Sequence, residues 1–76
     1  MSPNDLVNKK LGNTICEARR GAGFTQLQFA LKSGIDQSNL SKYERGERKI
    51  SVYMLHKFAQ ALDLSIGDLY AAIIIK

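Results

Sequence analysis

One helix-start signal, repeated four times, limits what this chain can fold into. Each copy has an apolar residue, then a Ser, Thr or Asp, and then an apolar residue four positions after the polar one. The polar side chain can accept hydrogen bonds from the free amides of a helix start, and the two apolar residues can pack across that cap. The four copies are Phe24-Thr25 with Phe29, Ile35-Asp36 with Leu40, Ile50-Ser51 with Leu55, and Leu64-Ser65 with Leu69. A chain with four such starts is expected to be helical.

The segments between these starts are short, so strands have little room. A fifth start lies at Ser2-Pro3-Asn4-Asp5, because Pro is favoured at the first position of a helix. We therefore expect a compact all-α fold of five helices, over residues 3–20, 25–32, 36–44, 51–62 and 65–73. The tail Leu69–Ile75 contains three successive β-branched residues, and it fits a strand as well as a helix.

The length and composition of the chain exclude several classes of protein. The 76 residues suffice for one domain, 1–76, without a separate sensor or catalytic domain. No apolar run could span a bilayer, there is no signal-peptide core, and the lone Cys16 cannot form an intrachain disulfide. His56 is the only histidine, and we find no metal-spaced cluster, phosphate loop or nucleophile motif. We expect a cytoplasmic protein that is not an enzyme and has no cofactor, metal, small-molecule ligand or membrane partner.

Positive charge is concentrated in the first two-thirds of the chain. Residues 1–49 hold nine Lys and Arg against five Asp and Glu, whereas residues 50–76 hold two of each class. This asymmetry favours a polyanionic partner for the first part, although modest basicity alone is also common in other proteins.

The stretch from Thr25 to Gly46 has the features of two short helices joined by a tight turn. Ala30 is small where a second helix must cross, Gly34 can adopt the positive φ that ends a helix, and Ile35 can bury the turn. Leu40 and Tyr43 then share the inner side of the second helix. Its outer side carries Gln37, Ser38, Ser41 and Lys42. This pattern predicts a helix-turn-helix.

Residues 11–70 resemble the Cro/repressor-type helix-turn-helix regulators, the XRE family, which includes phage repressors and restriction-modification controller proteins. The resemblance rests on Leu11-Gly12, Ile15, Arg19, Gly23, Thr25-Gln26, Phe29-Ala30, Gly34-Ile35, Ser38, Ser41 through Gly46, and Ser65 through Leu69. It implies a five-helix, lambda-repressor-like fold with a reading unit near 25–45. It also implies a homodimer on an inverted-repeat operator in double-stranded DNA, usually as a transcription regulator.

The resemblance also assigns roles to particular positions. It implies base contacts in the major groove from Gln37, Ser38 and Lys42. It implies phosphate contacts from Gln26, Asn39, Arg45, Arg48 and Lys49, and a structural ion pair between Arg19 and Glu44. The polar residues of this set could instead be solvated residues of an exposed helix, and the basic ones an ordinary surface charge cluster interleaved with Glu44 and Glu47.

The C-terminal third is the candidate dimer surface. It is neutral, and residues 65–76 offer more apolar side chains than one short helix can bury. The candidates are Leu69, Tyr70, Ile73, Ile74 and Ile75. The alternative is a tail that folds onto the domain's own core.

Two functions fit the pattern. The first is a sequence-specific DNA-binding regulator, with repression favoured over activation because so small a dimer has little surface left to recruit polymerase. The second is a protein-interaction module with the same fold, such as an antirepressor or a toxin-neutralising partner. RNA binding is disfavoured, because the few aromatic residues belong mostly to the expected core.

Overall fold

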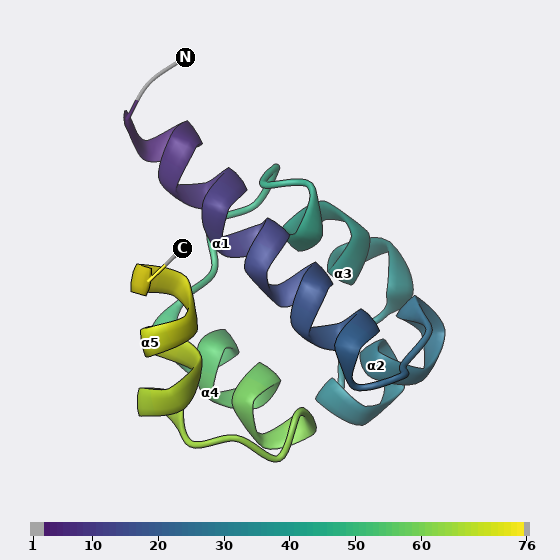
Figure 1. Cartoon of the computed structure of the whole chain (residues 1–76). Coiled ribbons are helices and arrows are strands. Elements are labelled where there is room, and N and C mark those ends of the chain that lie inside the picture. Colours follow the sequence, from purple (N-terminus) through teal and green to yellow (C-terminus); the bar gives the residue numbers. More distant parts are fainter. Residues whose placement is uncertain (1–2, 76) are drawn as a thin grey trace.

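A computed structural model describes residues 3–75 of the chain and the side chains of residues 3–72. The described part contains five helices and no strand: α1 Pro3–Gly21, α2 Gln26–Ser33, α3 Gln37–Glu44, α4 Val52–Ala61 and α5 Ile66–Ile75 (Figure 1). The predicted all-α class is confirmed, and each predicted range agrees to within a residue or two. The tail that fitted either a strand or a helix is helical as far as Ile75.

The four predicted caps explain where α2 to α5 begin. Each polar side chain accepts the amide hydrogen of the residue three positions later, over 2.8 to 3.1 Å. The donor and acceptor pairs are Gln28 with Thr25, Asn39 with Asp36, Met54 with Ser51, and Asp68 with Ser65. At α2 the Gln28 side chain also accepts from the Thr25 amide at 2.9 Å, which completes a capping box.

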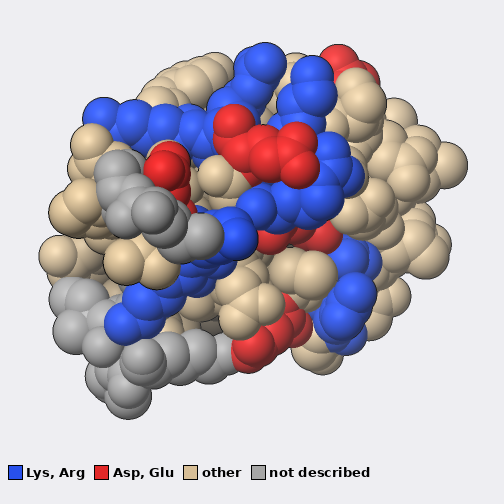
Figure 2. Space-filling model, turned by 90° about the horizontal axis from the view of Figure 1, so that it is seen from above, with Lys and Arg blue, Asp and Glu red and all other residues tan. Residues whose placement is uncertain are grey.

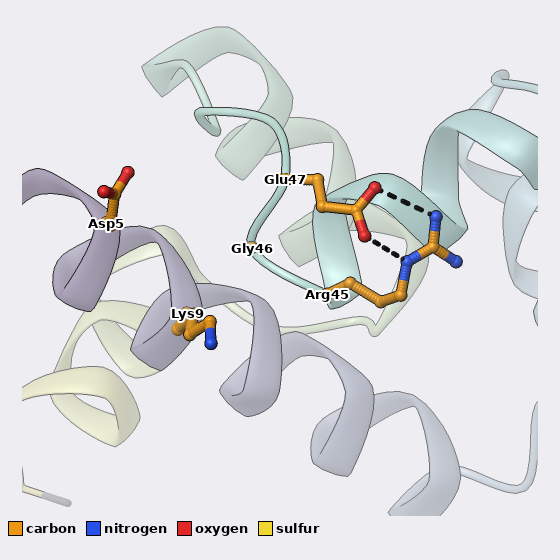
Figure 3. A pocket seen from close by; sticks show the side chains of 5 residues that line it. All are labelled: Asp5, Lys9, Arg45, Gly46 and Glu47. Atoms are coloured by element: carbon orange, nitrogen blue, oxygen red, sulfur yellow. Dashed lines mark hydrogen bonds and ion pairs between the residues drawn. The ribbon is translucent and has the colours of Figure 1, made fainter. Parts of the chain in front are cut away.

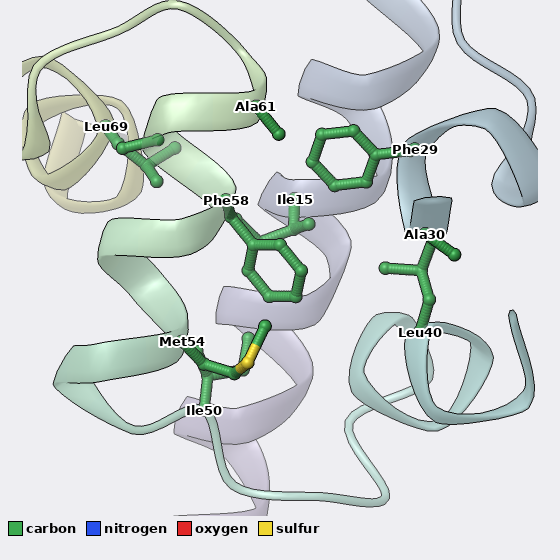
Figure 4. Close-up of a cluster of buried hydrophobic side chains, with 10 residues drawn as sticks. Ile15, Phe29, Ala30, Leu40, Ile50, Met54, Phe58, Ala61 and Leu69 are labelled. Carbon is green, nitrogen blue, oxygen red and sulfur yellow. The ribbon is translucent and has the colours of Figure 1, made fainter. Parts of the chain in front are cut away.

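The helices surround one cluster of buried apolar side chains (Figure 4). α1 packs on α3 and α5, and α4 packs on α2 and α5. The ring of Phe29 from α2 stacks on Phe58 from α4 with centroids 5.6 Å apart, and Tyr43 of α3 meets Phe58 edge-on at 5.8 Å. Tyr43 is therefore a packing residue, as its place in the helical pattern suggests.

Leu69 of α5 belongs to this core, and this burial corrects one sequence-based expectation. Its side chain is 0% exposed. The sequence pattern predicts Leu69 on the dimer surface, but a residue fully enclosed by its own domain cannot contact a second subunit.

Two glycines let α1 and the C-terminal end of α3 meet backbone to backbone. A methyl group on Gly12 would overlap the carbonyl oxygen of Tyr43 and stand 2.8 Å from that of Glu44. A methyl group on Gly46, which follows α3, would stand 2.7 Å from the Cα of Lys9 in α1. No larger residue fits at either place, so the two glycines fix the position of α3 relative to α1.

Candidate nucleic-acid interface

The turn between α2 and α3 has the geometry that the sequence predicts. Gly34 has φ 74° and ψ 28°, the left-handed conformation that ends a helix, and its amide donates to carbonyl oxygens in the last turn of α2. The amide of Ile35 donates to the Ala30 carbonyl at 3.0 Å, and Ala30 is buried where the two helices meet. α2 and α3 thus form a compact helix-turn-helix.

α3 presents a polar outer face. Leu40 is buried on its inner side, whereas Gln37, Ser38 and Lys42 are exposed. All three are residues for which we predict base contacts. Asn39 is half-buried beside them and Ser41 is half-buried one turn on, so the exposed face is narrow. An α-helix with such a face can enter the major groove of B-DNA.

A chain of side-chain hydrogen bonds joins this face to the interior. Gln37 Nε2 donates to Gln26 Oε1 at 3.5 Å, and Gln26 Nε2 donates to Glu44 Oε1 at 3.0 Å. Gln26 is half-buried at the start of α2. Its Oε1 is within hydrogen-bond distance of the Gln37 amide, a contact in addition to the phosphate contact that we predict for it. The sequence carries no sign of this contact, because the two glutamines are eleven positions apart on different helices.

The chain of bonds ends at a buried ion pair. Arg19 Nε lies 2.7 Å from Glu44 Oε2, Arg19 Nη2 lies 3.2 Å from Glu44 Oε1, and the two side chains are 7% and 4% exposed. Arg19 also donates to the carbonyl oxygen of Phe24 at 2.8 Å. The hydrogen bonds to Glu44 raise the pKa of Arg19 above its ordinary value, so the guanidinium stays charged. The pair ties α1 to the end of α3.

Asp36 directs its negative charge toward the start of its own helix. Its Oδ1 accepts from the Asn39 amide and from the Ser38 hydroxyl, each at 2.8 Å, and these bonds hold the pKa of Asp36 below its usual value. Lys42 and Arg48 are near enough to lower this pKa further. Because the Ser38 hydroxyl hydrogen is bonded to Asp36, the Ser38 oxygen faces outward as an acceptor.

Arg45 begins the turn after α3, and it forms a second ion pair. Its Nε and Nη2 donate to the two carboxylate oxygens of Glu47 at 2.7 and 3.1 Å (Figure 3). Its Nη1 donates to Ser41 Oγ. The two charged side chains are 54% and 55% exposed. The next two residues, Arg48 and Lys49, are also predicted phosphate contacts, and both are exposed.

Positive charge gathers on one face of the molecule. Figure 2 shows Lys and Arg side chains spread across the top of the molecule as Figure 1 draws it, with acidic side chains between them. The face is mixed in sign, so its attraction for a polyanion depends on which cations are already paired. Arg45 is already paired with Glu47 on this surface. The negative charge of Asp36 is turned toward the start of α3.

Apolar side chains are also exposed away from α3. Tyr70 of α5 is 57% exposed, and Leu6 and Val7 of α1 are 58% and 55% exposed. Leu6 and Val7 are not part of the predicted dimer surface. The side chains of Ile73, Ile74 and Ile75, which are part of it, lie outside the described residues.

Two further features of the described residues bear on the class of protein. No helix among residues 3–75 is long and apolar enough to cross a membrane. In the same part of the chain, no three His, Cys, Asp or Glu residues lie together as ligands of a metal ion would.

Comparison with known proteins gives consistent matches. Residues 17–69 match the family HTH_3, described as helix-turn-helix. The uncharacterized HTH-type transcriptional regulator y4dJ of Sinorhizobium fredii is 39% identical over 63 residues, which cover 83% of this chain and 82% of that protein. The antitoxin PezA of Streptococcus pneumoniae is 32% identical over 59 residues, 78% of this chain but 37% of the antitoxin. The structure of the restriction-modification controller protein C.AhdI from Aeromonas hydrophila superposes with a TM-score of 0.83 at 32% identity, over 90% of this chain and 99% of that one.

Proposed function

This chain belongs to the helix-turn-helix family HTH_3, and from that premise we propose that it regulates transcription by reading a specific sequence in double-stranded DNA. The observation that carries the proposal is the exposed face of α3, where Gln37, Ser38 and Lys42 lie together while Leu40 anchors the opposite side in the core. The proposal includes no catalytic step.

Base reading is assigned to the three exposed residues of α3. A glutamine can pair bidentately with adenine and a lysine can donate to guanine, each worth about 1–3 kcal/mol of discrimination between bases. The bond that Gln37 donates to Gln26 favours one direction of the Gln37 amide before DNA arrives. Ser38 acts as an acceptor, because its hydrogen is given to Asp36.

Phosphate contacts come from residues around α3. They are Gln26, Asn39, Arg45, Arg48 and Lys49. These contacts set the register of α3 on the duplex and make the affinity depend on salt, but they carry no sequence information.

A homodimer on an inverted repeat completes the proposal. One recognition helix reads only a few base pairs, so specific binding needs two half-sites about 34 Å apart. Tyr70 and the isoleucines at 73–75 are the proposed interface, without the buried Leu69. We propose repression as the mode of regulation, because DNA and a second subunit together would cover most of so small a surface.

The similarity to the antitoxin PezA favours one second candidate, a module that binds another protein with the same fold. The two candidates differ in which surface matters. A DNA reader depends on both Gln37 and the α5 surface, whereas an interaction module tolerates changes at Gln37 and Lys42.

Selection of bound sequences from a random DNA pool tests the proposal. The wild-type chain is expected to enrich an inverted repeat with half-site centres one helical turn apart, and Gln37→Ala is expected to relax one position of each half-site. Gln60→Ala is the matched control, because Gln60 is exposed on α4 away from the predicted contacts. If no sequence is enriched by the wild type, the DNA-reading proposal fails and the interaction module takes its place.

A further inference from the structure

The turn after α3 brings together two exposed side chains of opposite charge, Arg45 and Glu47. Arg45 is the C-cap residue of α3, and Gly46 follows it with φ 75°. The amide of Gly46 donates to the Tyr43 carbonyl at 3.1 Å, and that of Glu47 donates to the Lys42 carbonyl at 2.9 Å. These two bonds are those of a Schellman motif, which closes the helix end and leaves little freedom to the backbone.

The contact of Gly46 with α1 fixes the same turn from the other side. A Cβ there would stand 2.8 Å from both the amide nitrogen and the Cγ of Lys9. Asp5 and Lys9 of α1 form one wall of a hollow, and the turn from Arg45 to Glu47 forms the other (Figure 3). Arg45 and Glu47 therefore face each other because the backbone on both sides places them there.

The ion pair uses a defined part of the guanidinium group. A guanidinium has five N–H donors, and Glu47 occupies the edge formed by Nε and Nη2 while Ser41 takes a third donor from Nη1. The two remaining N–H groups, one on each Nη, stay available. While this pairing lasts, Arg45 can meet a phosphate through these two donors, and its Nε–Nη2 edge is held by the carboxylate.

This arrangement has different effects on the two kinds of DNA binding. Binding to non-specific DNA comes almost entirely from cations that neutralise phosphates. A carboxylate paired with one of these cations therefore weakens non-specific binding directly. In an operator complex each phosphate sits in one place, and a guanidinium that is already oriented loses less side-chain freedom on meeting it. On the operator, this smaller loss of side-chain freedom offsets part of the affinity that the pairing with Glu47 costs. On non-specific DNA, nothing offsets that cost.

We propose that Glu47 is a specificity-determining residue, which holds Arg45 so that sequence-independent binding is weakened more than operator binding. The proposal rests on the proposed DNA-reading function. It assigns Glu47 no contact with DNA. Glu47 acts through Arg45, in the free protein and in the complex.

The test is a salt titration of DNA binding with Glu47→Gln, on the selected operator and on a scrambled duplex of equal length. On scrambled DNA, Glu47→Gln is expected to steepen the slope of log Kobs against log salt by about 0.9, the value for one further neutralised phosphate. Between about 50 and 200 mM salt this corresponds to a change of about 3.5-fold in the ratio of variant to wild-type affinity. The operator affinity rises less, so the ratio of operator to scrambled affinity falls.

Two controls separate pairing from a simple loss of negative charge. Glu17→Gln changes the net charge equally at an exposed site on α1, where the carboxylate accepts from Asn13 at 3.1 Å. Arg45→Gln removes the partner, so Glu47→Gln added to it is expected to have no more effect than Glu17→Gln. All these side chains are exposed, and circular dichroism checks that each variant is folded.

Three results would overturn the proposal. They are an equal effect of Glu17→Gln, an undiminished effect of Glu47→Gln in the Arg45→Gln background, and an unchanged ratio of operator to scrambled affinity. Failure of the underlying function looks different, because the wild type itself would then show no preference for any sequence.

Discussion

Loss of the Glu44 charge is expected to destabilise the fold far more than loss of the Glu47 charge, although both carboxylates bind an arginine through two hydrogen bonds. Glu44→Gln keeps the side-chain volume but leaves Arg19, whose side chain is 7% exposed, without its counter-charge. Breaking one partner of a buried pair costs about 3–5 kcal/mol. For a domain of this size, each kcal/mol lowers the melting temperature by roughly 4–8 °C. We therefore expect a drop of at least about 12 °C from the lower of these figures.

Thermal and urea melts followed by circular dichroism measure this drop, with Glu47→Gln as the control. Glu47 is 55% exposed, and water screens its pair with Arg45, so its substitution should leave the melting temperature almost unchanged. The double variant Arg19→Met, Glu44→Gln removes both charges and is expected to recover part of the stability lost in Glu44→Gln alone. Equal melting temperatures for Glu44→Gln and the wild type, or no recovery in the double variant, would refute the reasoning.

Three further substitutions follow from contacts described above. Gly12→Ala would press a methyl group into the carbonyl oxygens that end α3 and should lower stability by at least about 1–3 kcal/mol in a urea melt, whereas Gly21→Ala, with open space around it, should not. Ser33→Ala removes a buried hydroxyl that has no hydrogen-bond partner among the described residues, so the melting temperature should hold or rise. Asp36→Asn should flatten the acid side of the curve of stability against pH, measured by urea melts. Because folding lowers the pKa of Asp36, its contribution to stability is present above the ordinary pKa and is lost as the pH falls through the lowered pKa.

Each of these expectations has a result that contradicts it. A Gly12→Ala variant as stable as wild type would mean that α1 and α3 can separate slightly without loss. A destabilised Ser33→Ala would indicate a hydrogen bond to that hydroxyl in solution. A pH profile of Asp36→Asn parallel to wild type would show that the cap does not depend on the charge of Asp36.

The sequence predicted local features well, because they depend on residues three or four positions apart. Thr25, Asp36, Ser51 and Ser65 cap helices as expected, and Gly34 ends α2 in the left-handed conformation. Each of these bonds joins neighbours along the chain. The pattern around each cap therefore contained the whole interaction.

Contacts between segments far apart in the sequence could be predicted less well. The roles of Gly12 and Gly46 depend on how closely α1 crosses α3, and no spacing in the sequence encodes that distance. The hydrogen bond between Gln26 and Gln37 likewise needs the folded arrangement of two helices. Leu69 is instructive, because its cap pattern with Leu64 already indicated an inward side chain, yet the apolar tail suggested a surface for a second subunit.

The close contacts at Gly12 and at Gly46 have a consequence for how such a protein can change its target. At Gly12, α1 meets the end of α3 through main-chain atoms, so this contact does not involve the side chains on the outer face of α3. Residues 37, 38 and 42 can then be exchanged while the scaffold that aims them stays the same. Under the proposed function, new operator preferences are therefore accessible through a few substitutions, without any need to evolve a new way of holding the helix.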